Sequence, residues 1–275
     1  MLRFPGQSLR IGIAPNAVSL LRVSRWRGPK RTVLAERAYV APADGAGQAE
    51  ALAQALRALL DGQDTQGWPL AAVVSDELVR LWQVKPPPQA TRLADIEAAA
   101  ALRFHSLYGE APAAWQVSAD WRAGEPFFAA ALPRMLLAAL EVAAQDHGMT
   151  LVECVPHFVT AWNRWHRALR PDAWFAHAHG ELLTLAAIEG GELLALRPLP
   201  LPQGADHQWL TQAVQREALL LGAGVPPLLQ LAGQLPPQLA KPAGSGQVPV
   251  ALLGSTAAGE QLSAACLLAA SGSAA

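Results

Sequence analysis

Short apolar and alternating runs, separated by turn residues and by helical stretches, form a pattern that occurs twice along the chain. In the first copy the runs predict three strands, a helix and a fourth strand, at 9–14, 18–23, 32–40, 48–60 and 70–75. In the second copy they predict the same order at 174–177, 182–188, 192–199, 206–221 and 227–231. The copies share no obvious sequence identity, so the pattern alone indicates a duplicated α/β fold.

A block with a different pattern, residues 76–149, separates the two copies. Its predicted elements are a strand at 77–85, a helix at 92–107, strands at 114–121 and 126–132, and a helix at 133–147. Thr91 is the expected N-cap of the first helix, and Gly148 is the expected residue that ends the second. A strand at 248–253 and a helix at 260–270 are predicted to close the chain.

These patterns predict the domain organisation. A first lobe covers 1–75, an inserted α+β subdomain covers 76–149, a return strand with a linking helix covers 150–170, and a second lobe covers 171–275. Apolar residues make up 52% of the sequence and charged residues 16%, a composition typical of a packed globular protein.

Charge and hydropathy narrow the function classes. The formal net charge is −1, which gives no broad electrostatic basis for binding nucleic acid. The start of the chain lacks the apolar core of a signal peptide, and no apolar run reaches the roughly 18 residues of a membrane span. We therefore expect a cytoplasmic protein that does not cross the membrane.

One local excess of positive charge stands out, namely Arg22, Arg25, Arg27, Lys30 and Arg31. Two interpretations stay open. The cluster is either the solvated tip of a hairpin, or a contact with anionic lipid or an acidic partner.

Cysteine and histidine give no ligand set for a metal. Cys154 and Cys266 lie in apolar patterns without CxxC or Cys/His spacing, so we expect small buried side chains. His177 and His179 share one strand face and could grip a metal, but no third ligand is near in sequence, and a hydrogen-bonded pair is the simpler interpretation. No phosphate-binding loop, dinucleotide fingerprint or G-x-S-x-G motif is present.

Two copies of this unit, with an insertion after the first, resemble the actin-like ATPase superfamily, whose fold is a duplicated ribonuclease H-like α/β unit. Within the insertion, Ser75 to Arg80 followed by Pro86-Pro87-Pro88, and the segments 103–109 and 114–117, are similar to PilM-like type IV pilus assembly proteins. The cytoplasmic domain of the type II secretion protein GspL is also similar. The resemblance implies that 76–149 is the small subdomain that PilM shares with the cell-division protein FtsA.

The resemblance also implies where a nucleotide would bind. Members of the superfamily hold phosphate on two hairpins, each with an acidic residue for Mg²⁺ and a glycine-rich turn. Here Ala14 stands at the first acidic position and Asn16 at the glycine, after Gly12. His179 and Gly180 stand at the second hairpin. The adenosine elements would be Glu217 and the turn Gly254-Ser255. We expect a degenerate cleft, no ATP hydrolysis and no cofactor, although ATP binding stays open.

A fold that loses its chemistry can keep its surfaces. The resemblance implies that the cytoplasmic N-terminal peptide of a PilN-like inner-membrane protein docks beside the subdomain. The residues predicted for this groove alternate along the first strand of the subdomain and close its following helix. They are Leu78, Arg80, Trp82, Phe104 and Tyr108. The competing interpretation is that these side chains pack the core of the subdomain.

The sequence therefore leads to two expected functions. The first is a non-catalytic scaffold at the inner membrane, peripheral to a type IV pilus or type II secretion-like assembly platform. The alternative is an actin-like ATP-binding switch with an unusual site. Whether the chain forms a homodimer stays open.

Overall fold

The computed structural model describes residues 6–24, 30–40, 42, 45–190, 192–254 and 262–272. The chain divides into two compact units, 1–160 with 262–275, and 161–261. Each unit is described by itself.

The first unit is built on a five-stranded sheet with the order β3-β2-β1-β4-β8. Its strands are β1 (Gln7–Ile13), β2 (Ala17–Ser24), β3 (Lys30–Ala38), β4 (Pro69–Val74) and β8 (Thr150–Pro156). β1, β2 and β3 form an antiparallel meander, whereas β4 runs parallel to both β1 and β8.

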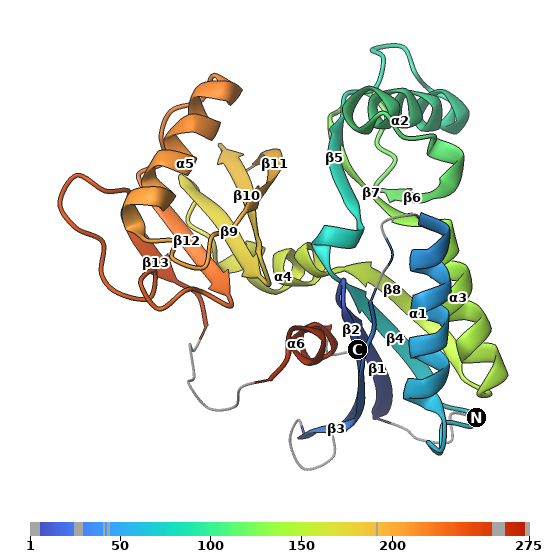
Figure 1. Ribbon diagram of the computed structural model, residues 1–275. Coiled ribbons are helices and arrows are strands. Elements are labelled where there is room, and N and C mark those ends of the chain that lie inside the picture. Colours follow the sequence, from blue (N-terminus) through green and yellow to red (C-terminus); the bar gives the residue numbers. More distant parts are fainter. Residues whose placement is uncertain are drawn as a thin grey trace. The chain divides into compact units, whose positions relative to one another are not determined.

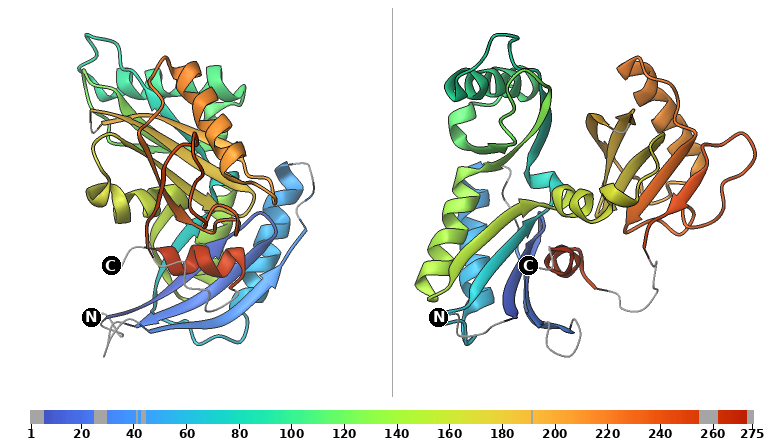
Figure 2. Two further views of the ribbon diagram at one scale, coloured as in Figure 1. Left: turned by 90° about the vertical axis from the view of Figure 1, so that its left-hand side faces the viewer. Right: turned by 180° about the vertical axis from the view of Figure 1, so that it is seen from behind.

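Helices cover both faces of this sheet. One face packs against α1 (Gly45–Leu60) and α3 (Arg134–Asp146), and the other against α6 (Ala264–Ser271) (Figures 1 and 2). The alternation of a strand explains this division, because Ile11 and Ile13 join the core under α1 and α3 while Ala14 joins the cluster under α6.

The insertion is a three-stranded sheet with the order β5-β7-β6 and one long helix. Its elements are β5 (Arg80–Val84), α2 (Leu93–Tyr108), β6 (Trp115–Ala119) and β7 (Phe127–Pro133), with short 3₁₀ turns at Asp76–Leu78 and Pro112–Ala114. It has a core of its own around Trp82, Phe104, Trp115 and Phe127.

The second unit repeats the order of the first, with the sheet β11-β10-β9-β12-β13. The strands are β9 (Ala173–His179), β10 (Leu182–Glu189), β11 (Glu192–Pro200), β12 (Leu228–Gly233) and β13 (Val250–Leu252). α5 (His207–Leu221) precedes β12 (Figure 1). α4 (His157–Trp165), followed by a 3₁₀ turn at His166–Ala168, leads into this unit, where Trp162 contacts Phe175 of β9. The two matching strand orders confirm the duplication.

Three sequence predictions need correction. Thr91 does not cap α2, because the capping position is Arg92, which makes no side-chain cap bond. α3 packs against α1 in the main core of the first unit and not within the insertion. The last helix begins at Ala264 and belongs to the first unit instead of closing the second lobe. By contrast, Gly148 follows α3 with a φ of 66°, as its role in ending that helix requires.

Candidate functional site: the carboxyl edges of the two sheets

The parallel strands of the first unit end at one edge of its sheet. Because β1, β4 and β8 run in the same direction, the residues that follow them lie along this edge, namely Ala14, Ser75 with Asp76, and His157. Ligands of open α/β sheets bind outside the carboxyl ends of such strands. This edge is therefore the candidate site of the first unit.

The turn between β1 and β2 is closed by its own hydrogen bonds. The N–H of Ala14 donates to the carbonyl of Ala17 at 2.9 Å, and the carbonyl of Ala14 accepts a 2.7 Å bond from the hydroxyl of Tyr39. The N–H of Tyr39 donates to the carbonyl of Asn16 at 2.9 Å. Pro15 has no N–H, so Ala14 and Pro15 offer no free backbone donor to a phosphate.

α6 covers the same turn. The side chain of Ala14 is 1% exposed and packs with Val73, Ala265 and Leu268. Gly12 lies directly beneath the helix, since a Cβ on this residue would overlap the carbonyl of Ala265 and stand 2.6 Å from the nitrogen of Ala269. Gly12 is thus required for helix packing, a role that the sequence prediction did not give it.

α6 is also fastened at both ends. The buried guanidinium of Arg10 donates to the carbonyl of Gly272 at 2.7 Å, just past the end of the helix. At the start of the helix, Ser263 caps it by accepting from the N–H of Cys266, and the Ser263 hydroxyl donates to a carboxylate oxygen of Glu36 on β3. The helix is therefore held over β1 and β2 by polar contacts as well as by packing.

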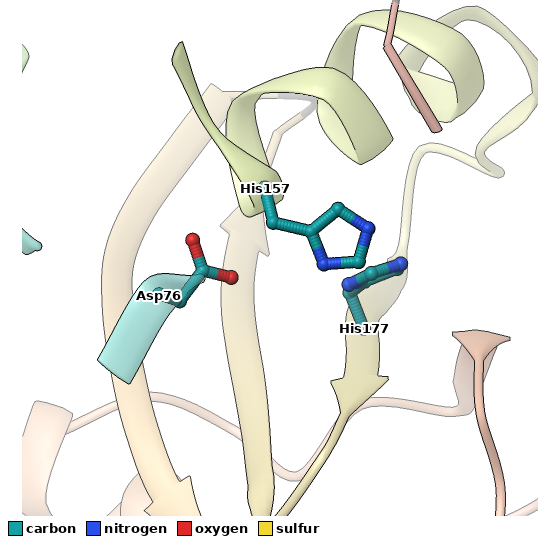
Figure 3. A group of neighbouring side chains, drawn as sticks. All are labelled: Asp76, His157 and His177. Atoms are coloured by element: carbon teal, nitrogen blue, oxygen red, sulfur yellow. The ribbon is translucent and has the colours of Figure 1, made fainter. Parts of the chain in front are cut away.

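Asp76 and His157 follow the neighbouring strands β4 and β8. Oδ1 of Asp76 accepts a 2.9 Å bond from the N–H of Phe158, at the first turn of α4. A carboxylate oxygen of Asp76 and a ring nitrogen of His157 lie within 4.8 Å of each other (Figure 3). A carboxylate at this place satisfies a helix N-terminus. His177, also drawn in Figure 3, belongs to the second unit and is described with its own strand. Neither Asp76 nor His157 was predicted as a site residue from the sequence.

The corresponding edge of the second unit carries two histidines. β9, β12 and β13 are parallel, and His177 and His179 lie near the carboxyl end of β9 on one face of the strand. Burial lowers the pKa of His177 to about 3, with His179 as a second cause, and burial lowers the pKa of His179 to about 4. Both rings are therefore neutral at neutral pH and offer nitrogen rather than oxygen to a cation.

Gly180 forms the turn that follows. Its φ is 59°, and His179 pairs with Leu182, so Gly180 and Glu181 make a two-residue hairpin loop. Gly180 is where the prediction placed it, and its conformation serves the turn.

A glycine that sequence reasoning missed lies on the strand beside β9. Gly233 ends β12 with a φ of 96°, and a Cβ here would overlap the carbonyl of Ala178. The predicted Gly254 follows β13, one strand farther from β9, and a Cβ there would stand 3.1 Å from the ring of Trp165. Gly233 is thus the glycine that adjoins the second hairpin. Ser255 lies outside the described residues.

Glu217, predicted as an adenosine contact, forms ion pairs with two arginines. It is a buried residue of α5 whose carboxylate lies 3.0 Å from Arg216 and 3.5 Å from Arg197 of β11. These ion pairs join the helix to the edge strand of the sheet. They explain the buried charge without a ligand.

The predicted partner groove divides into buried and accessible residues. Trp82 is 2% exposed and Phe104 is fully buried, and their rings pack edge-on with centroids 5.2 Å apart. The expectation that these two side chains face a partner is therefore wrong. Leu78 packs partly against the main core of the first unit.

Arg80 and Tyr108 stay at the surface of the insertion. The guanidinium of Arg80 lies 2.9 Å from the carboxylate of Glu110 and stacks over the rings of Tyr108 and Trp115 at 5.4 and 5.0 Å. The side chain of Arg80 keeps an exposed fraction of 30%. Arg80 and Tyr108 are thus the members of the predicted groove that form one surface cluster.

Comparison with known proteins identifies the fold. No family model and no curated protein sequence matches the chain. Among solved structures, one in the PilM–PilN type IV pilus biogenesis complex is similar, at 19% identity and a TM-score of 0.53, over 84% of this chain and 82% of the other. The cytoplasmic domain of EpsL, an inner-membrane component of the type II secretion system of Vibrio cholerae, is similar at 14% identity and a TM-score of 0.55, over 90% of both chains.

A third similar structure is a protein with an actin-like ATPase fold and unknown function from Bacteroides thetaiotaomicron, at 11% identity and a TM-score of 0.57, over 86% of both chains. These likenesses confirm the predicted actin-like fold. Among the described residues, no helix has the length and apolar character needed to cross a bilayer.

Proposed function

We propose that this chain is a non-catalytic scaffold of a type IV pilus or type II secretion-like assembly platform at the inner membrane. Two of the structures that share its fold are named as parts of such machines, the PilM–PilN complex and the EpsL cytoplasmic domain. That likeness supports a role in such an assembly platform. The residues of the two hairpins support the non-catalytic part of the proposal.

The observation that supports this proposal most directly is the burial and hydrogen bonding of Ala14. Mg²⁺ takes oxygen ligands, and phosphate on a hairpin turn needs free backbone N–H groups. At Ala14 the side chain is a buried methyl group, and the backbone N–H and carbonyl are both bonded within the protein. These residues do not fit the phosphates of Mg-ATP.

The second hairpin supports the same conclusion. A neutral histidine at the acidic position supplies neither a carboxylate for Mg²⁺ nor a positive charge for phosphate, and the pKa of His179 is lowered to about 4. Ala14 and His179, at the two positions where the superfamily carries acidic residues for Mg²⁺, thus have side chains without an oxygen ligand.

The partner in this proposal is the extended cytoplasmic peptide of a PilN-like membrane protein. Such peptides bind by adding to a sheet edge and by placing side chains against arginine and aromatic residues. β5 is an edge strand of the three-stranded sheet and begins with Arg80, and Tyr108 forms one surface cluster with Arg80. We assign peptide contact to these two residues.

Fluorescence anisotropy with a labelled N-terminal peptide of a PilN-like protein tests the partner assignment. Arg80→Glu should weaken binding at least tenfold, the effect of losing about 1.4 kcal/mol. Arg103→Glu, which reverses an exposed charge on α2, should leave the affinity unchanged. Since Arg80→Glu also removes the pair with Glu110, Arg80→Met provides a milder second variant, and circular dichroism confirms that each is folded. Equal affinity for all variants would refute the role of Arg80.

Thermal unfolding with and without millimolar Mg-ATP tests the absence of a nucleotide site. A ligand that binds only the native state raises the unfolding temperature. We expect no shift. A shift of several degrees would instead favour the ATP-binding switch.

A further inference from the structure

We propose that Arg22, Lys30 and Arg31, at the end of the β2–β3 pair in the first unit, form a binding surface for an anionic membrane. This inference does not rest on the proposed scaffold function, because it uses neither the peptide partner nor the carboxyl edges of the two sheets.

Positive charge is concentrated at the start of the sequence. Residues 1–35 contain seven lysines and arginines and no aspartate or glutamate. The remaining 240 residues carry fourteen lysines and arginines against twenty-two carboxylates, a formal charge of −8. A negative surface therefore attracts one part of the chain and repels the rest, which orients the protein.

The three cations occupy the last residue pairs of the two strands. The register sets Arg22 opposite Thr32, Val23 opposite Arg31, and Ser24 opposite Lys30. All three cationic residues are exposed. Within the part of the chain that the structure describes, they make no hydrogen bond or ion pair.

The nearest carboxylate in sequence does not neutralise them. Glu36 lies farther along β3, opposite Ser19, and its carboxylate accepts a hydrogen bond from the hydroxyl of Ser263, just before α6. Cations that form no ion pair with any described carboxylate are the feature that anionic headgroups recognise.

The distribution of these cations favours a membrane over an acidic strand that adds to the sheet edge. Directly paired residues share a face, so Arg22 and Lys30 lie on the face of Thr32, and Arg31 lies on the other. Charge therefore surrounds one end of the strand pair, and Arg22 is on β2, which is not the edge strand. An added strand would meet charges along β3, whereas a headgroup layer meets all three at once.

An exposed apolar residue adjoins the cations. Val33, on the face of Arg31, is 47% exposed. A short apolar side chain next to cations suits the boundary between headgroups and acyl chains.

Vesicle co-sedimentation of the full chain tests this proposal. We expect binding to vesicles of phosphatidylglycerol and phosphatidylcholine, no binding to phosphatidylcholine alone, and release at high salt. Each cation near an anionic surface contributes about fivefold, so the triple variant R22Q/K30Q/R31Q should bind about a hundredfold more weakly.

The matched control is R57Q/R92Q/R103Q, which removes the same charge from exposed positions of the first unit. This variant should bind like the wild type, and circular dichroism verifies that both variants are folded. An equal loss of vesicle binding in both variants would show that binding depends only on net charge, and would refute the proposed site. Unchanged binding by the first variant, or equal binding to neutral vesicles, would also overturn it.

Two further outcomes contradict a lipid surface. Retention on immobilised poly-glutamate without vesicle binding would assign the cations to an acidic protein partner. Binding to neither would mean that the charges only protect the end of the edge strand from pairing.

Discussion

The hydroxyl of Tyr39 donates a 2.7 Å hydrogen bond to the carbonyl of Ala14, and so ties the end of β3 to the turn between β1 and β2. The two residues are 25 positions apart in sequence. Burial raises the pKa of Tyr39 to about 12, so the phenol stays a donor across the physiological range. The turn between β1 and β2, where the resemblance of the sequence predicts a degenerate phosphate-binding hairpin, is thus held by the side chain of the residue that follows β3.

Removal of that hydroxyl should cost stability without opening a nucleotide site. Tyr39→Phe leaves the carbonyl of Ala14 without its donor, which costs about 1–2 kcal/mol in the free energy of unfolding. Urea denaturation measures this loss. Thermal unfolding with Mg-ATP should show no shift in the variant, since the N–H of Ala14 still bonds Ala17. A nucleotide-dependent shift gained by the variant would show that Tyr39 blocks a site that is otherwise competent.

Gly12 should tolerate no side chain. Gly12→Ala places a Cβ against the backbone of α6, at Ala265 and Ala269, where no flexible side chain can yield. We expect a loss of about 3 kcal/mol in the free energy of unfolding, because overpacking forces the backbone to shift. Gly204→Ala is the control, since no atom lies within 4 Å of its added Cβ, and its effect should stay near zero. Comparable losses in the two variants would show that α6 is not held tightly over β1.

The sequence predicted much of this fold because the relevant signals are local. Apolar periodicity and turn residues located the paired runs of strands, and the repeated order of elements indicated two units whose sheets have matching topology. Gly148 and Gly180 were identifiable because a helix end and a hairpin turn each require a positive φ.

Contacts between distant segments could not be predicted in this way. The return of α6 to the first unit depends on the open space above Gly12, and the burial of Trp82 depends on where α2 packs on its sheet. The side chains of β5 alternate between the two faces of the sheet whether one face lines a partner groove or packs a core. The pattern was therefore compatible with both interpretations. Asp76 gave no signal because an acidic residue after a strand is common, and its bond to Phe158 spans 82 positions.

Glu217 should contribute to stability rather than to ligand binding. Glu217→Gln keeps the shape of the side chain but removes the charge that Arg197 and Arg216 share. Because the arginines are partly exposed, we expect a modest loss of about 1–2 kcal/mol by urea denaturation. Glu125→Gln, whose contact with Arg122 is 3.9 Å long and exposed, should change stability by less than about 0.5 kcal/mol. If both variants lose the same amount, the buried carboxylate is not a special contact.

The buried histidines of β9 should make the second unit sensitive to mild acid. The pKa values of His177 and His179 in the folded chain are about 3 and about 4, below the ordinary value of 6.5. Between those values and 6.5 the unfolded chain binds more protons than the folded chain, so the free energy of unfolding falls as the pH falls. The contribution is complete above 6.5 and is lost as the pH drops toward the folded pKa values.

At about pH 5 each histidine should lower the free energy of unfolding by about 2 kcal/mol relative to about pH 7.5. Urea denaturation at the two pH values measures this difference. In His177→Gln and His179→Gln the pH-dependent loss should shrink by about 2 kcal/mol, whatever the substitution does to stability at neutral pH. His105→Gln, an exposed substitution on α2, should leave the pH dependence as it is. A pH dependence that survives in both strand variants would assign the acid sensitivity to other groups, and would mean that the β9 histidines can accept protons without unfolding the sheet.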